Sequence, residues 1–294
     1  MVSVIICSVR KDLATQIKAN IENSIGVPWQ DIIIDNTNPG RGINAVYNEG
    51  VRKAKFEIIC FVHEDVAFKT DNWGKLLVSY FESDPKLGML GVAGAGYKSQ
   101  TPSGWMTGIE EFDRYSILHT SPSGNDIRMH FDQLPAAPLK KVAVLDGVLL
   151  CSRKSILEQI PFDEQRLPGF HLYDIDISFR IAEKYEVAVS FEIDLVHFTE
   201  GGNFGDSWLE NTLNWHQFMR SRLPFKKGEK TVVDKGIENR IAKFWLNRLR
   251  IEKISLANKW RWIKMSGAVG NPARWINMGI FLFYRPLYGK WKKK

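Results

Sequence analysis

The chain lacks the features that mark secreted, membrane-spanning or repetitive proteins. Its first residues, MVSVIICSVR, contain no basic stretch before the apolar run and no small-residue cleavage site. No window reaches the roughly 18 apolar residues that a membrane span requires. Internal repeats and Pro-rich or Gly/Ser-rich linkers are also missing. These absences predict a soluble, globular protein of the cytoplasm.

Cysteine is scarce as well. Only Cys7, Cys60 and Cys151 are present, each inside an apolar run and none in a CxxC pair. Isolated cysteines of this kind are typical of buried, reduced thiols. The sequence therefore predicts neither a disulfide framework nor a cysteine zinc site.

Charge is divided unevenly along the 294 residues. Residues 226–294 contain 18 Lys and Arg and 4 Asp and Glu, a net charge of +14. Residues 1–225 contain the remaining 22 Lys and Arg and 29 Asp and Glu, a net charge of −7. The only polar, breaker-containing bridge between the two parts is RLPFKKGEKTVVDKG. We expect a first domain over 1–225 and a basic helical extension over 226–294.

The first part alternates strand-like and helix-like segments. Val2–Cys7, Ile32–Ile34 and Glu57–Val62 are short apolar runs that predict buried strands. Asp12–Ile25 and Gly42–Ala54 have the spacing of amphipathic helices. This alternation predicts an α/β fold with parallel strands, in which ligands bind at the carboxyl edge of the sheet.

Polar groups follow three of the expected strands and loops. Carboxylates and imidazoles gather at these places: His63, Glu64 and Asp65; Asp174 and Asp176; and His197. Oxygen and imidazole nitrogen ligands from separate segments suit a divalent cation such as Mg²⁺ or Mn²⁺. Taken singly, the two later aspartates also fit a helix first turn, and each histidine fits an ordinary hydrogen-bonded residue. Their joint occurrence favours the metal site.

The order of these segments resembles that of inverting family 2 glycosyltransferases with the GT-A fold, and more narrowly a bacterial branch with a histidine-containing motif. The resemblance covers about residues 1–225. It is carried by VSVIICSVR, IIIDNT, INAVYNEGVRKAKFEIICFVHEDV, LDGVLLCSRKSI and FDEQRLPGFHLYDIDISFR. It implies a mixed sheet flanked by helices and a sugar donor linked to a nucleoside diphosphate.

The resemblance also implies roles for individual residues. Asp174 matches the catalytic base, and Asp65, His197 and His63 match the metal site for Mn²⁺ or Mg²⁺. Residues expected to bind the nucleotide or donor are Cys7, Ser8, Asp35, Asn44, Asn48 and Glu64. Residues expected at the acceptor are Asp146, Gly147 and Tyr173. The segment 94–134 is rich in Gly, Ser and aromatic residues and is expected to form loops that shape a sugar pocket, with Trp105 as the candidate. His171, in a later loop, is the other candidate. A Trp packed under a surface loop is the alternative for Trp105.

Two positions depart from the family pattern. His63 stands where the DXD motif has its first aspartate, with Glu64 between it and Asp65. His63 either coordinates the metal, contacts the donor sugar, or leaves the metal to Asp65, His197 and the diphosphate. Tyr173 stands where the family has a glutamate directly before the base.

The basic extension has its own pattern. From Gly236 to about Met265 the apolar spacing predicts one amphipathic helix. The run WINMGIFLFYRPLYGKWKKK is too short to span a bilayer but suits its interface. Its aromatic residues at headgroup depth would be Trp275, Tyr284, Tyr288 and Trp291. The alternatives are packing on the first domain or on a second subunit.

Together these patterns predict a metal-dependent, inverting glycosyltransferase that acts on a glycan or lipid-linked glycan at the inner face of the membrane. A nucleotidyltransferase is the first rival, although CSVRKDLATQ lacks the glycine-rich loop that such enzymes carry after the first strand. A non-catalytic sugar-binding relative is the second. Nucleic-acid binding through the basic tail is the third, but the sequence contains no recognised module for it. We expect no nucleic-acid partner.

Overall fold

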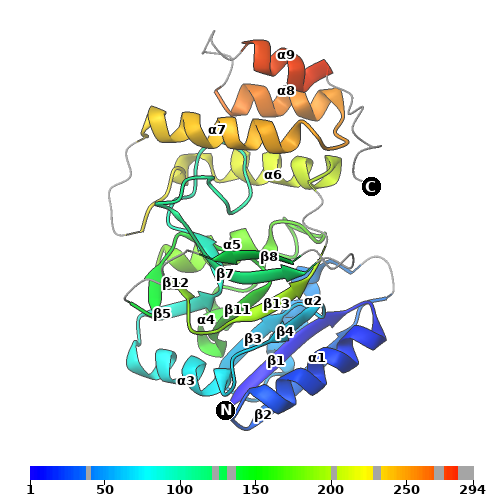
Figure 1. The fold of residues 1–294 in the computed structure, drawn as a ribbon, viewed down its shortest axis with the longest axis vertical. Helices are drawn as coiled ribbons and strands as arrows, with labels where there is room; N and C mark the ends of the chain where they lie inside the picture. The colour runs from blue at the N-terminus through cyan, green and yellow to red at the C-terminus, as the bar shows by residue number, and fades with distance from the viewer. Residues whose placement is uncertain are drawn as a thin grey trace.

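The computed structural model describes residues 1–37, 41–120, 126–130, 137–199, 204–227, 233–267 and 275–283. A sheet-containing body carries a stack of helices at one end (Figure 1). The amino terminus lies at the far side of the body from this stack. Chain segments from both predicted parts thus build one elongated molecule.

The strands fall into two sheets. In chain order they are β1 (Val2–Ser8), β2 (Trp29–Asp35), β3 (Ile58–Val62), β4 (Val66–Phe68), β5 (Leu87–Gly91), β6 (Ala93–Ala95), β7 (Asp113–Thr120), β8 (Asp126–His130), β9 (Leu139–Lys141), β10 (Val144–Leu145), β11 (Leu149–Arg153), β12 (Glu186–Ser190) and β13 (Leu195–Phe198). The larger sheet has the order β2-β1-β3-β11-β5-β12-β9, and the smaller runs β10-β6-β7-β13-β4 with β8 on β7. Parallel and antiparallel pairs occur in both, as a mixed sheet requires.

The expected strands are present. β1 and β3 are almost entirely buried, because both faces of the larger sheet are covered by helices. The segment 94–134, expected as loops, instead contains β6, β7 and β8. Its glycines and aromatics favoured loops, but 113–120 is a strand paired on both sides.

Helices cover the larger sheet on both faces. They are α1 (Lys11–Ser24), α2 (Ile43–Lys53), α3 (Trp73–Ser83), α4 (Lys154–Gln159) and α5 (Tyr173–Ala182). Apolar residues of α1 and α3 share one hydrophobic cluster with the strands, and those of α2, α4 and α5 share another. Burial of these apolar faces is the main stabilising contribution to the fold.

A third hydrophobic cluster joins the body to the helical stack. The stack consists of α6 (Asp206–Phe218), α7 (Lys235–Leu249), α8 (Leu256–Met265) and α9 (Trp275–Phe283). Phe179 of α5 packs in the same cluster as Trp245, Trp262 and Phe281 from the stack. The core is therefore continuous across the predicted boundary at residue 225.

Polar contacts reinforce this junction. The Glu238 carboxylate on α7 accepts hydrogen bonds from the Tyr97 hydroxyl at 2.8 Å, from the Gln100 backbone N–H at 3.0 Å, and from the Thr101 backbone and hydroxyl groups at 3.0 and 2.9 Å. The indole of Trp262 donates to the Pro102 carbonyl at 2.8 Å. The basic helices thus hold the loop between β6 and β7.

The expected single helix from Gly236 to Met265 is wrong. The structure has two helices, α7 and α8, separated by residues 250–255. Ser255 ends the break because its hydroxyl caps α8 by accepting from the Asn258 backbone N–H at 3.3 Å. The helical spacing of apolar residues continues from Leu249 to Leu256 across this break, so the sequence pattern did not reveal the break.

The apolar run after Trp275 is partly core. It forms α9, in which Met278 is 8% and Phe281 0% exposed. Tyr284, Tyr288 and Trp291, expected at a membrane interface, lie outside the described residues. Among the helices that the structure describes, none has the length and apolarity to cross a membrane.

Candidate active site

The polar groups expected at the sheet edge come from neighbouring strands. β3 ends at Val62, and His63, Glu64 and Asp65 connect it to β4. β4 pairs antiparallel with β13, which places His197 opposite Val66. The Phe198 backbone N–H also donates to the Asp65 carbonyl at 2.8 Å. Strand pairing therefore sets His197 beside Asp65, although 132 positions separate them (197 − 65).

Three of these side chains converge. The His197 Nε2 lies 3.3 Å from the Asp65 Oδ1, and the His63 Nδ1 lies 3.9 Å from the same oxygen. One potential ligand atom from each residue lies within 4.8 Å of the other two. Two imidazole nitrogens and a carboxylate oxygen in this arrangement fit a divalent transition metal.

Tyr173 orients the His63 ring. The Tyr173 hydroxyl donates to the Gly147 carbonyl at 3.2 Å and lies 2.7 Å from the His63 Nε2. When the phenol hydrogen is bonded to the carbonyl, the Tyr173 oxygen accepts from the Nε2–H of His63, and in this tautomer Nδ1 keeps a lone pair on the side of Asp65. A side chain at position 147 would collide with the Tyr173 hydroxyl, which explains the glycine.

The protonation states also suit metal binding. Burial and the neighbouring His197 lower the pKa of His63, so its ring is neutral at physiological pH. Burial acts to raise the pKa of Asp65, but the His197 and His63 imidazoles outweigh it and hold that pKa below its usual value. The cluster therefore presents a carboxylate and a neutral imidazole.

Asp174 lies in the first turn of α5, directly after Tyr173. Burial, followed by the negative charge of Asp146, raises the pKa of Asp174 to about 7, although backbone N–H groups of Ile175 and Gly147 act in the opposite direction. A carboxylate with this pKa can accept a proton near neutral pH. Asp146 itself is fixed by a 2.9 Å bond from the Val148 N–H to its Oδ1.

A model of the Glycosyltransferase like family matches residues 3–211, which is more than two thirds of the chain. The chain belongs to this family. No curated protein sequence matches it.

Solved structures of other glycosyltransferases share the fold. GalNAc-T7 with UDP, GalNAc and Mn²⁺ has a TM-score of 0.51 at 11% identity, over 75% of this chain and 48% of its own. The mannosyltransferase PcManGT of Pyrobaculum calidifontis, with GDP-Man and Mn²⁺, has a TM-score of 0.50 at 13% identity, over 92% of this chain and 74% of its own. TarS 1-349 of S. aureus, with UDP-GlcNAc, has a TM-score of 0.50 at 11% identity, over 90% of this chain and 79% of its own. The chain thus has a GT-A fold and spans about half the length of GalNAc-T7.

The residues expected at the donor divide into two groups. The first surrounds the loop after β1, where the Glu64 carboxylate accepts from the Ser8 hydroxyl at 2.7 Å and from the Arg10 N–H at 3.1 Å. Asp35 lies opposite Ser8 in the β1–β2 register, and Cys7 precedes it on β1. Burial raises the pKa of the Cys7 thiol to about 11, so it stays protonated.

The second group, Asn44 and Asn48 on α2, bonds the loop before α5. The Asn44 amide donates to the Leu167 carbonyl at 2.7 Å, and Asn48 exchanges two bonds with the Phe162 backbone at 2.9 and 3.0 Å. These amides hold the loop that leads to Asp174. The structure does not bring them into the cluster of His63, Asp65 and His197.

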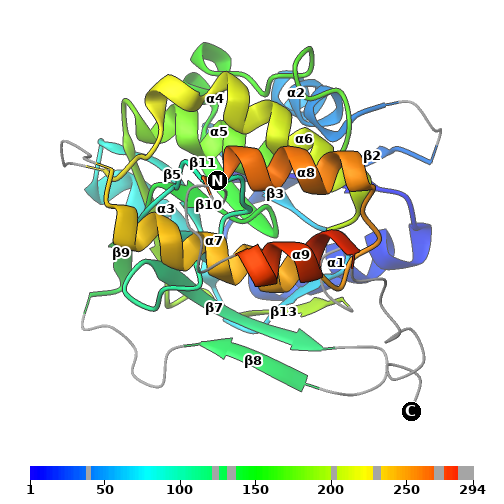
Figure 2. The same cartoon turned by 90° about the horizontal axis from the view of Figure 1, so that it is seen from above.

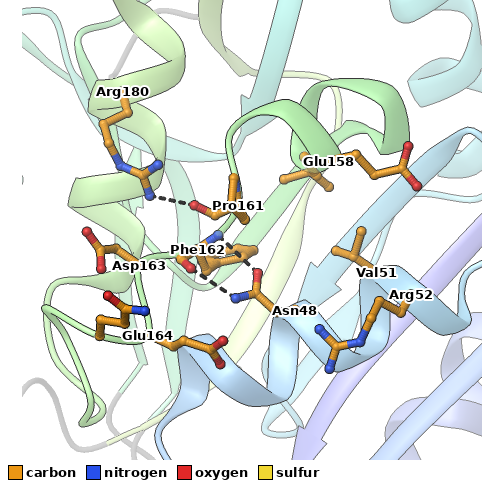
Figure 3. Close-up of a pocket in the computed structure, with 11 residues that line it drawn as sticks. Asn48, Val51, Arg52, Glu158, Pro161, Phe162, Asp163, Glu164 and Arg180 are labelled. Atoms are coloured by element: carbon orange, nitrogen blue, oxygen red, sulfur yellow. Dashed lines mark hydrogen bonds between the residues drawn. The ribbon is translucent and has the colours of Figure 1, made fainter.

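Asn48 also lines an open pocket of about 500 Å³ between α2, α4 and this loop (Figure 3). Arg180 borders the pocket and donates to the Pro161 carbonyl at 2.8 Å. None of the metal-site candidates lines this pocket. The pocket is therefore separate from the candidate active site.

The remaining acceptor candidates are half-buried. Trp105 packs between two hydrophobic clusters, with its ring 6.1 Å from that of Tyr115. His171 stacks edge-on against Phe170 at 5.9 Å, and burial lowers the pKa of its imidazole. Their roles at an acceptor stay predictions.

Asp176 has a structural role. It is 1% exposed, accepts from the Trp215 indole at 3.0 Å, and pairs with Arg180 at 2.7 Å. These contacts tie α5, and so Asp174, to α6.

Three residues near the cluster were missed from the sequence. His119 on β7 is in register with His197, and the two rings lie 5.3 Å apart. Phe170 is 58% exposed with its ring 6.4 Å from His63, and Phe198 directly follows His197 and is 48% exposed. None of the three has a local sequence signal, because strand register and side-chain exposure are set by the tertiary structure.

Proposed function

We propose that this glycosyltransferase moves a sugar from a nucleoside diphosphate to an acceptor hydroxyl, with inversion and with a bound divalent cation. The observation that carries the proposal is a cluster of His63, Asp65 and His197 linked through Tyr173 to a partly buried aspartate, Asp174, whose pKa lies near neutrality. The GT-A neighbours that contain UDP or GDP-Man together with Mn²⁺ support this assignment.

His63, Asp65 and His197 would hold the cation as a His-Glu-Asp variant of the DXD motif completed by a late histidine. Two imidazoles in the set favour Mn²⁺ over Mg²⁺. When bound, the cation neutralises charge that develops on the leaving diphosphate. Tyr173 holds the His63 ring so that Nδ1 stays available.

Asp174 would remove the proton of the acceptor hydroxyl while that oxygen attacks the anomeric carbon. Single-step inversion requires the base and the leaving group on opposite faces of the sugar. The base lies on α5, whereas the proposed metal ligands lie on the β3–β4 connection and on β13. Glu64 and Ser8 would shape the nucleotide loop beside β1.

We propose a glycan or lipid-linked glycan as the acceptor, with the enzyme at the inner membrane surface. The +14 charge balance of residues 226–294 supports attraction to anionic lipid. The exposed rings of Phe170 and Phe198 support an acceptor that presents apolar faces, as sugar rings do.

A thermal-unfolding screen tests the donor. In the presence of Mn²⁺, we expect one UDP- or GDP-sugar to raise the melting temperature, because a ligand at 100 times its Kd stabilises the folded state by about 2.7 kcal/mol. Chelation of the metal should remove most of this shift. If no nucleotide sugar raises the melting temperature with metal present, the proposed function is rejected.

The pH dependence of kcat/KM tests the base. Asp174 acts when deprotonated, so kcat/KM should rise with pH and level off above about 7. The negative charge of Asp146 helps to raise the pKa of Asp174, so in Asp146→Asn the rise should occur at lower pH. Lys98 and Tyr173 also lie close to Asp174 and are unchanged in this variant.

Asp163→Asn provides the control, because Asp163 pairs with Arg166 in the loop before α5. Its pH profile should match that of the wild type. An Asp146→Asn profile that also matches the wild type would contradict the electrostatic coupling of Asp146 to the base.

A further inference from the structure

Helix α8 has two faces of unusual composition. Trp262 and Ile263 are completely buried, whereas Leu256 is 61% and Trp260 45% exposed. Because successive residues advance by 100°, positions 256, 260 and 264 lie along one side of the helix. The outward side of α8 thus carries a leucine and a tryptophan followed by Lys264, where a solvated helix would carry charged groups.

This orientation is fixed by polar contacts on the inner side of α8. The Asp206 Oδ1 accepts from the Ser255 backbone N–H and hydroxyl, both at 3.0 Å, and from the Asn258 amide at 2.8 Å. The Arg261 guanidinium donates to the Asn214 amide oxygen at 2.8 Å. Residues of α6 therefore hold α8 in one rotation, so Leu256 and Trp260 cannot turn into the core.

Exposed basic residues lie close to the exposed apolar ones along the chain. Arg250, Lys253 and Lys264 are exposed, and Ile251 between the first two is 42% exposed. The Lys264 ammonium lies 5.4 Å from the centre of the Trp260 ring. Apolar side chains, an aromatic ring and cations together are the composition of surfaces that bind anionic membranes.

The position of this surface suits such a contact. α8 and α9 run beside each other on the outer side of the helical stack, away from the strands (Figures 1 and 2). The α9 run that the sequence suggested for the membrane has Met278 and Phe281 in the core. Among the α9 side chains that the structure describes, Ile280 is 43% exposed, compared with 61% for Leu256 and 45% for Trp260 on α8.

We propose that the α8 docking face, defined as Ile251, Leu256 and Trp260 with Arg250, Lys253 and Lys264, binds the surface of an anionic lipid bilayer. The apolar side chains would enter the region between headgroups and acyl chains, and the basic ones would contact the anionic headgroups. Such docking places the proposed transfer reaction beside lipid-linked acceptors. Docking itself requires neither donor nor metal, so it can be tested without the reaction.

Flotation of the full-length chain with vesicles tests the proposal. The wild type should bind vesicles of phosphatidylglycerol and phosphatidylcholine and should not bind vesicles of phosphatidylcholine alone. L256S/W260S should weaken binding to the anionic vesicles at least about tenfold, since two apolar side chains no longer enter the interface. Both residues are largely exposed, so the melting temperature should stay unchanged.

The matched control is F218S/V233S, which removes two apolar residues of similar exposure, 52% and 44%, at other sites. It should bind anionic vesicles as the wild type does. Equal binding by L256S/W260S and the wild type would assign any membrane contact to other residues and overturn the proposal. The proposal also fails if L256S/W260S dissociates a dimer in sedimentation while vesicle binding is unchanged, because the face would then join two copies.

Discussion

Asp174→Asn should abolish sugar transfer while leaving donor and metal binding intact. An amide cannot accept the acceptor proton, and loss of a general base typically costs about 10²–10⁴-fold in rate. The substitution preserves the shape of the side chain, and the neighbouring Asp176 still ties α5 to α6. The measurement is kcat for transfer, compared with the affinity for the donor by calorimetry in the presence of Mn²⁺.

Asp163→Asn separates this effect from a general loss of one carboxylate. Asp163 lies in the loop before α5 and pairs with Arg166, so its replacement should leave kcat close to that of the wild type. If Asp174→Asn turns over at the wild-type rate, Asp174 is not the base. A variant that loses donor binding as well would instead point to a folding defect, which its melting temperature would reveal.

Asp65→Asn should abolish high-affinity metal binding. Asp65 supplies the one carboxylate of the candidate metal site and lies within 4 Å of both imidazoles. Outer-shell changes alone cost about 10–100-fold in affinity, so we expect a ligand loss to exceed about 100-fold. Calorimetry or Mn²⁺ electron paramagnetic resonance measures this directly, without any turnover.

Glu64→Gln is the matched comparison, one position away in the chain. The Glu64 carboxylate points to the loop after β1 and contacts Ser8 and Arg10, so the metal affinity of this variant should be unchanged. His63→Gln then answers the question that the motif left open. A large loss of metal affinity in His63→Gln assigns His63 as a ligand, and an unchanged affinity limits it to the donor.

Much of the candidate metal site could be predicted from the sequence because two of its residues follow a strand end. β3 is a continuous apolar run, and the polar residues after it must emerge at the edge of the sheet. The place of Asp174 in a helix first turn was likewise visible as an apolar spacing that begins beside it. His197 was expected at the metal through the family resemblance. Its position beside Asp65 results from the pairing of β4 with β13, which no local sequence pattern encodes.

Other parts of the site depended wholly on long-range contacts. His119 lies beside His197 only because β7 and β13 run parallel in register, and the segment was expected to be a loop. The raised pKa of Asp174 depends on burial and on Asp146, which is 28 positions away (174 − 146). Asn44 and Asn48 matched a family helix, but their amides bond the backbone of a distant loop.

The sequence by itself determined the α/β pattern, the polar strand end at His63–Asp65, the helix that begins at Asp174, and the uneven division of charge. Each depends on residues close together in the chain, where periodicity and propensity act. Tertiary structure alone decided that His119 lies beside His197, that the basic tail splits at Ser255, and that Phe281 is core while Trp260 is exposed. A helix with apolar residues on several sides can bury any one of these sides. Which side is buried depends on the helices that pack against it.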